Sequence, residues 1–198
     1  MYKLDLLPAE LKTGAAELCS MLEIPISDGG TPITAKHGDM SIEKGANSVE
    51  ITYGTKPQFF RMLSMLTGKI EGKYCENPRQ TMLCYMADQS RNAVMNTDTA
   101  KRMIRYLAAL GFDSLMLYTE DTYEVKGQPY FGYMRGRWTE SELIELVEYG
   151  EMFGIELIPC IQTLAHLARM MRWKCYKDII DCNDILLAGD EKTYAFIE

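Results

Sequence analysis

Three short apolar runs alternate with helical patterns in the second part of the chain. The runs cover residues 82–87, 114–118 and 155–160, and each is followed directly by polar residues. A strand–helix–strand–helix–strand order is typical of a parallel sheet with right-handed crossover connections. In such sheets ligands bind beyond the carboxyl ends of the strands. The sequence therefore predicts an α/β region whose chemistry lies at the ends of these three strands.

Start and stop signals bound the two intervening helices. The first is predicted to begin at Thr97 or Asp98 and to end at Gly111. The second begins at a capping box in residues 139–142, where Thr precedes Glu by three positions, and ends at Gly154. Its helical periodicity predicts three residues that face the interior. These are Leu143, Ile144 and Val147.

The first 80 residues have a different pattern. A helix is predicted from Pro8 and a second helix from Pro57. Alternating residues between them predict three short strands, the last two joined as a hairpin. These strands cover residues 32–36, 40–44 and 48–53. We therefore predict a small α+β domain over residues 1–80 and an α/β domain over residues 81–198, joined by a linker at residues 76–79.

Polar residues follow each of the three predicted parallel strands. They are Asp88 and Arg91 after the first strand, Glu120 and Asp121 after the second, and Gln162 and His166 after the third. Carboxylates and a guanidinium at one sheet edge suit a neutral ligand with many hydroxyl groups. Two simpler interpretations stay open: Arg91 in a surface ion pair with Asp88, and His166 as a hydrogen-bonded core residue.

A long loop follows the second strand, from Thr119 to Trp138. Most strand-to-helix connections have about 2–6 residues, and longer ones are usually functional or disordered. This loop holds five aromatic residues, too many for disorder. They are Tyr123, Tyr130, Phe131, Tyr133 and Trp138. Either these rings stack on sugar rings, with Tyr123, Tyr133 and Trp138 as the candidates, or they form a minor core under the loop.

Composition excludes several classes of function. A net charge of −7 argues against a nucleic-acid partner. No apolar run approaches the about 20 residues of a membrane span, and we read no secretory signal. Six scattered cysteines without a CxxC pair suggest free thiols and a cytoplasmic protein, and Cys84 and Cys160 fall in strands predicted to be buried. With two histidines and no ligand spacing, we expect no metal site.

The strand ends resemble glycoside hydrolase family 20, the β-N-acetylhexosaminidases. The resemblance rests on residues 88–91 (DQSR) and 154–166 (GIELIPCIQTLAH), and residues 118–125 and 130–137 resemble the bacterial, intracellular-type branch of the family. It implies an α+β domain followed by a (β/α)8 TIM-type barrel. About three of the eight barrel units would be present, so the barrel would be incomplete.

The resemblance also implies roles for individual residues. Arg91 would bind the 3- and 4-hydroxyls of a terminal N-acetylhexosamine, His166 would support the hydrogen-bond network, and Glu120 or Asp121 would lie in the acidic region after the second strand. The partner would be an N-acetylhexosamine-containing oligosaccharide, and no cofactor is expected. Gln162 and residues 164–165 depart from the family pattern, which often has an acid and Pro-Gly there.

The family mechanism is retaining and substrate-assisted: the 2-acetamido oxygen attacks the anomeric carbon while an Asp-Glu pair after the fourth strand assists. We considered Asp190 and Glu191 for this pair and reject them, because acids there also suit a helix N-terminus. The catalytic pair would then lie beyond this chain, which alone would be inactive. A non-catalytic carbohydrate-binding protein and a structural or interaction module are the alternatives.

An incomplete sheet has a further consequence. A parallel sheet of three strands leaves apolar edges uncovered. We therefore expect a homo-oligomer formed through the exposed barrel edge, or a longer product of which this chain is a fragment.

Overall fold

The computed structural model describes residues 1–198, which form two compact units. The first unit comprises Met1–Tyr85, Asp98–Leu115 and Leu146–Leu157. The second comprises Met86–Thr97, Met116–Glu145 and Ile158–Glu198. The division does not coincide with the predicted boundary at residue 80, which stays a prediction.

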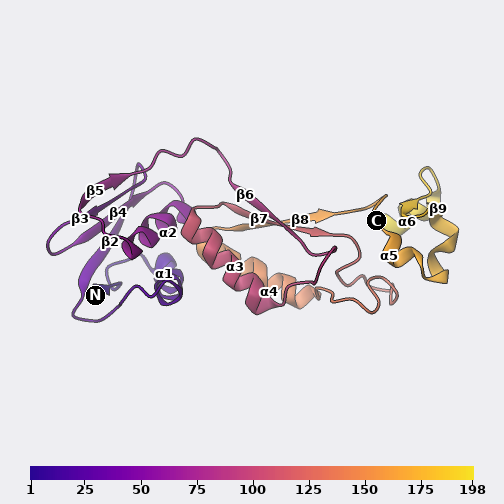
Figure 1. The fold of residues 1–198 in the computed structure, drawn as a ribbon, viewed down its shortest axis with the longest axis horizontal. Coiled ribbons are helices and arrows are strands. Elements are labelled where there is room, and N and C mark those ends of the chain that lie inside the picture. Colours follow the sequence, from indigo (N-terminus) through magenta and orange to yellow (C-terminus); the bar gives the residue numbers. More distant parts are fainter. The chain divides into compact units, whose positions relative to one another are not determined.

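The N-terminal residues form a five-stranded sheet with two helices (Figure 1). The sheet order is β1-β2-β4-β3-β5. The elements are β1 (Tyr2–Lys3), α1 (Ala9–Met21), β2 (Thr31–His37), β3 (Ser41–Lys44), β4 (Val49–Tyr53), α2 (Lys56–Ser64), the 3₁₀ helix η1 (Met65–Thr67) and β5 (Gly72–Cys75). Both predicted helices, the three predicted strands and the antiparallel β3–β4 hairpin are confirmed. The sequence missed β5, which is exposed throughout and is a strand because it pairs with β3.

The core of the first unit follows the alternation of β4. Val49, Ile51 and Tyr53 are buried, and the two residues between them are partly exposed. The Phe59 ring packs edge-on to Phe60 at a centroid distance of 5.2 Å. A strand with period-two alternation thus buries one face against α2, as the sequence predicts.

Three strands, four helices and a short hairpin follow β5. The elements are β6 (Cys84–Asp88), α3 (Thr97–Leu110), β7 (Ser114–Thr119), α4 (Glu140–Phe153), β8 (Glu156–Ile161), α5 (Ala168–Met171), the 3₁₀ helix η2 (Lys174–Ile179), β9 (Ile180–Cys182), β10 (Ile185–Leu186) and α6 (Glu191–Ile197). The predicted helices and strands through residue 161 are confirmed. Gly111 ends α3 with φ +81° and Gly154 ends α4 with φ +74°, the left-handed conformation that glycine adopts most readily.

The strands β6, β7 and β8 form one sheet in that order (Figure 1). Before the strands begin, Asp113 N–H donates to the Leu83 carbonyl, and Glu156 N–H donates to the Asp113 carbonyl. Where the strands end, Gln89 N–H donates to Tyr118 and Gln162 N–H donates to Thr119. The beginnings of the three strands are hydrogen-bonded to one another, and so are their ends. The three strands are therefore parallel.

Two predictions of burial are wrong. Only β7 is largely buried. The residues of β6 and β8 are exposed or half-buried except Ala87, and Cys84 and Cys160 are half-buried. The outer strands of a three-stranded sheet have one neighbour each, so their apolar side chains lack the cover that β7 receives. Ile144 and Val147 of α4 are also exposed; the buried residues of this helix are Leu146, Gly150 and Phe153.

Helix starts differ between the two parts of the chain. At the start of α4, Glu142 N–H donates to Thr139 Oγ1 at 3.2 Å, and Thr139 N–H donates to Glu142 Oε2 at 2.9 Å. This reciprocal pair is the predicted capping box. The residues before α1 and α2 make no such side-chain bond.

None of the helices combines the length and apolar character needed to cross a bilayer.

Candidate functional site

The carboxyl ends of β6, β7 and β8 all belong to the second unit. The hydrogen bonds Gln89–Tyr118 and Gln162–Thr119 hold the segments after the three strands next to one another. The predicted polar residues therefore start from one sheet edge. Within that edge the side chains fall into an exposed charged group and a buried polar group.

The exposed group is centred on Arg91. Its Nη1 donates to Asp88 Oδ2 at 2.5 Å, and its guanidinium carbon lies 5.0 Å from the centroid of the Tyr118 ring. Tyr118 in turn donates to Glu120 Oε1 at 3.3 Å. The Arg91 side chain is 59% exposed. The predicted ion pair with Asp88 is confirmed, and more than half of the Arg91 side chain stays exposed.

Hydrogen bonds set the charge state of this group. Burial alone would raise the pKa of Asp88, but bonds from the Arg91 side chain and from the backbone N–H groups of Ser90 and Arg91 outweigh it and lower that pKa. The pKa of Tyr118 is raised by burial and by the charge of Glu120. Asp88 is therefore ionised and Tyr118 neutral at pH 7, a state that offers both hydrogen-bond acceptors and donors.

The buried group is centred on Asp121, which is 2% exposed. Its carboxylate accepts from Arg135 Nη1, and Arg135 Nη2 donates to the Ser90 carbonyl. Ser90 Oγ accepts from Glu120 N–H at 2.7 Å. Asp121 thus ties the long loop to the ends of β6 and β7. Of the two neighbouring acids, Asp121 is buried and Glu120 stays partly exposed.

Ser90 and Arg135 hold this edge together through contacts that sequence reasoning did not predict. Each acts through a contact far along the chain, 30 and 45 residues away. The available signal was weak: a small polar residue after a strand, and an arginine in an aromatic loop.

His166 lies in the segment after β8. Its backbone has φ +62°, its side chain is 55% exposed, and Nδ1 lies 3.8 Å from Asp184 Oδ2. The alternative of a core histidine is therefore wrong. The polar contact of His166 is with Asp184 rather than with the group around Arg91, and an exposed imidazole can donate or accept a hydrogen bond.

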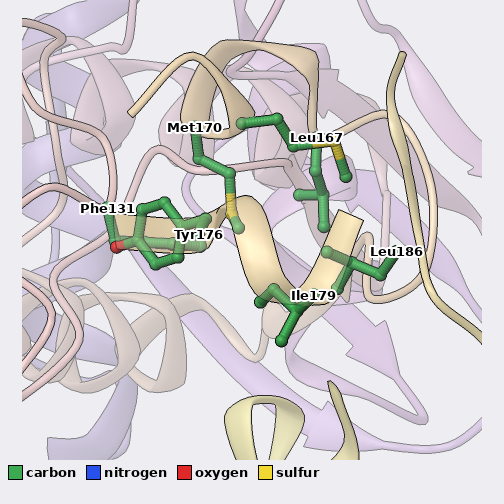
Figure 2. Close-up of a cluster of buried hydrophobic side chains, with 7 residues drawn as sticks. Phe131, Leu167, Met170, Tyr176, Ile179 and Leu186 are labelled. Carbon is green, nitrogen blue, oxygen red and sulfur yellow. The ribbon is translucent and has the colours of Figure 1, made fainter. Parts of the chain in front are cut away.

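The aromatic loop divides into buried and exposed rings. Phe131 and Trp138 are buried, and Tyr123 is partly buried against Phe131 at a centroid distance of 5.1 Å. Phe131 joins a cluster of apolar side chains from α5, η2 and β10 (Figure 2). This cluster contains Phe131, Leu167, Met170, Met171, Tyr176, Ile179 and Leu186. Trp138 is 1% exposed, so its placement gives no support to ligand contact, whereas Tyr133 is exposed.

A cavity of about 360 Å³ opens beside the end of β8. Its lining combines the polar residues Gln162 and Thr163 with apolar residues of the loop and of α6. Gln162 therefore lines a cavity to which Asp88, Arg91 and Glu120 do not contribute.

Asp190 and Glu191 begin α6. The Asp190 side chain accepts from Lys192 N–H at 2.9 Å and is the N-cap of the helix. The predicted helix start at these acids is confirmed. Their exclusion from catalysis stays a prediction.

Three comparisons place this geometry among known proteins. No family model matches the chain, and no curated protein matches it. Solved structures do match. A mutant β-hexosaminidase of Streptomyces plicatus in complex with the product GlcNAc aligns with a TM-score of 0.76 and 17% identity over 98% of this chain and 50% of that chain. The family 20 β-N-acetylhexosaminidase of Streptomyces coelicolor A3(2) aligns with a TM-score of 0.75 and 19% identity over the same shares.

A third structure, the family 20 exo-β-N-acetylglucosaminidase of Vibrio harveyi in complex with N-acetylglucosamine, gives a TM-score of 0.75 and 15% identity over 98% of this chain and 39% of that chain. The chain has the fold of the N-terminal region of glycoside hydrolase family 20 structures. The predicted resemblance is thereby confirmed at the level of the fold. The chain spans half or less of the length of these three structures.

Proposed function

We propose that this chain is the N-terminal region of a β-N-acetylhexosaminidase and carries part of its sugar-binding edge. Strands β6, β7 and β8 would be the first three strands of a (β/α)8 barrel. The single observation that carries the proposal is the exposed Arg91 guanidinium, held by Asp88 at the carboxyl end of a parallel strand in a fold shared with these enzymes.

Each member of the exposed group has a role in this proposal. Arg91 donates hydrogen bonds to two neighbouring hydroxyls of a terminal N-acetylhexosamine, because a guanidinium presents its donors in a planar fork. Asp88 fixes the orientation of that fork. Glu120 and His166 supply further polar contacts at the same edge.

Hydrolysis would follow the substrate-assisted retaining route, in which the 2-acetamido oxygen of the sugar attacks the anomeric carbon. An Asp-Glu pair outside this chain would orient the acetamido group and move the proton. Because Asp190 caps α6, we assign neither it nor Glu191 to that pair.

Sugar binding tests the role of Arg91. N-acetylglucosamine would be titrated into the chain and followed by calorimetry or NMR. We expect Arg91→Ala to weaken binding by about 1–3 kcal/mol, because hydrogen bonds from a charged group are lost. The control is Arg102→Ala, which removes an exposed arginine of α3 and should change nothing. Equal affinities for the parent chain and Arg91→Ala would reject the proposed site.

Turnover tests the placement of the catalytic pair. We expect no hydrolysis of a chromogenic N-acetylglucosaminide by this chain. Robust turnover that Glu191→Gln abolishes would show that Asp190 and Glu191 are the catalytic pair after all.

A further inference from the structure

We propose that Tyr130, Tyr133 and Trp173 form a stacking platform for a second pyranose ring, so that the chain binds oligosaccharides of N-acetylhexosamine more tightly than the single sugar. This inference rests on the proposed function and extends it. It assigns a role to the exposed half of the aromatic loop and to Trp173, which the strand-end site does not use.

The three rings form one exposed cluster in the second unit. Their centroids are 5.5 Å apart for Tyr130 and Tyr133, 5.5 Å for Tyr130 and Trp173, and 5.1 Å for Tyr133 and Trp173. Tyr130 is 44% and Tyr133 45% exposed, and Trp173 is partly exposed. The rings pack on one another in tilted and edge-on geometry, and the two tyrosines still keep more than two fifths of their surface exposed.

Two fixed points anchor the loop close to its two exposed tyrosines. Phe131, between the two tyrosines, is buried in the apolar cluster of Figure 2. Arg135 binds the Asp121 carboxylate and the Ser90 carbonyl. Gly132 lies between these anchors at φ +64°, where an added Cβ would collide with the Asp121 carbonyl and the Arg137 side chain. Exposed rings on a rigid turn bind with little loss of conformational entropy.

The chemistry of the cluster matches a sugar ring. A pyranose has an apolar face of C–H groups, which packs on an aromatic face, and hydroxyls around its edge. Arg172 lies over Trp173, with its guanidinium carbon 4.7 Å from the ring centroid, and donates to the Tyr133 carbonyl at 3.3 Å. The platform thus combines aromatic surface with phenol and guanidinium donors.

The platform also belongs to the same scaffold as the proposed sugar site. Arg135 contacts the Ser90 carbonyl, and the next residue along the chain is Arg91. One loop therefore presents the aromatic rings and is fastened to the strand end that carries the hydroxyl-binding arginine. A ligand with several linked sugars can use both features, whereas a single sugar can use one.

Intrinsic fluorescence tests the platform directly, because the chain has two tryptophans and only Trp173 belongs to the cluster. The chain would be titrated with N-acetylglucosamine and with its β-1,4-linked trisaccharide. We expect the trisaccharide to change the emission and to bind about two- to tenfold more tightly than the single sugar, the range expected for aromatic contacts. Trp173→Phe should remove the emission change, and Trp138→Phe should keep it.

A second variant measures affinity without the tryptophan signal. Tyr133→Ala should lower the affinity for the trisaccharide, measured by calorimetry, to that for the single sugar. The matched control is Tyr106→Ala, which removes an exposed tyrosine of α3 in the first unit and should leave both affinities unchanged. Circular dichroism would check that each variant is folded.

The outcomes separate this inference from the proposed function. Equal affinities for the two sugars, with no change in the emission of Trp173, would overturn the platform. Binding of the single sugar that depends on Arg91 would still support the proposed site. An emission change in Arg91→Ala with the same affinity as in the parent chain would support the platform and reject the role of Arg91. If neither sugar changes the emission and Tyr133→Ala converts an oligomer to a monomer in light scattering, the cluster is a contact between copies and the inference is wrong.

Discussion

The five-stranded and the three-stranded sheet bury their apolar residues in different ways. In β4 of the larger sheet, Val49, Ile51 and Tyr53 are buried in strict alternation. In β6 of the smaller sheet, Tyr85 and Met86 are neighbours in sequence and both are exposed. The larger sheet thus has a core made by the chain itself, whereas the smaller sheet has apolar strands on its outside without cover.

The difference follows from the number of neighbours of each strand. β4 pairs with β2 on one side and β3 on the other, and α2 packs on it. β6 and β8 each pair with β7 alone. Exposed apolar side chains along outer strands are typical of a surface that is covered by further strands or by a second copy of the protein.

The largest predicted effect is on the free energy of unfolding, and it is tested by truncating one side chain in each sheet. Ile51→Ala should lower the free energy of unfolding by about 2–5 kcal/mol, because it leaves a cavity in a closed core. Met86→Ala, at a residue 55% exposed, should change it by no more than about 0.5 kcal/mol. Urea denaturation would measure both. Met86→Ala should instead reduce self-association in light scattering, and a monomeric parent chain would contradict the expected oligomer.

Next in size is the buried ion pair at the strand ends. Asp121→Ala should destabilise the second unit by about 3 kcal/mol, because it removes the carboxylate that balances the charge of the Arg135 guanidinium. The control is Asp88→Ala, which breaks an ion pair on an exposed arginine and should have an effect below about 1 kcal/mol. Thermal unfolding followed at Trp138 and Trp173 reports on this unit. Equal effects of the two variants would contradict the distinction between buried and exposed groups.

A smaller effect is expected at the helix starts. Thr139→Ala should lower stability by about 1 kcal/mol, because α4 loses its capping box. Thr55→Ala before α2 removes no side-chain cap bond and should be nearly neutral. Thr139→Ser should keep most of the parent stability. These three variants, compared by denaturation, test whether α4 depends on local capping more than α2 does.

The smallest predicted effect is on how the stability of the fold depends on pH. The pKa of Asp88 is lowered in the fold, and so is that of Glu76, where burial is outweighed by hydrogen bonds from Arg61 and Tyr74. A lowered folded pKa gives stability that is present above the unfolded values of about 4 and is lost as pH falls through the folded value. Asp88→Asn and Glu76→Gln should each flatten the loss of stability below pH 4. Parallel pH profiles for the parent and both variants would contradict this.

Local sequence signals accounted for much of the fold. Alternation in residues 49–53, the capping box at Thr139 and the stop at Gly111 each depend on neighbours within a few positions, so they could be predicted without a structure. The same is true of the polar residues at the strand ends and of the helix start at Asp190. β5 and the segment of residues 167–189 were missed, because they fold by pairing and packing with distant parts of the chain.

The sequence by itself determined the order of strands and helices, the parallel edge with Asp88, Arg91 and Glu120, and the resemblance to family 20. Only the tertiary structure decided which of these side chains are exposed. It buried Asp121 and Trp138, exposed Tyr133 and His166, and brought Trp173 to the aromatic loop. Periodicity records which residues share a face, whereas burial depends on what packs against that face, and those contacts come from residues far apart in the chain.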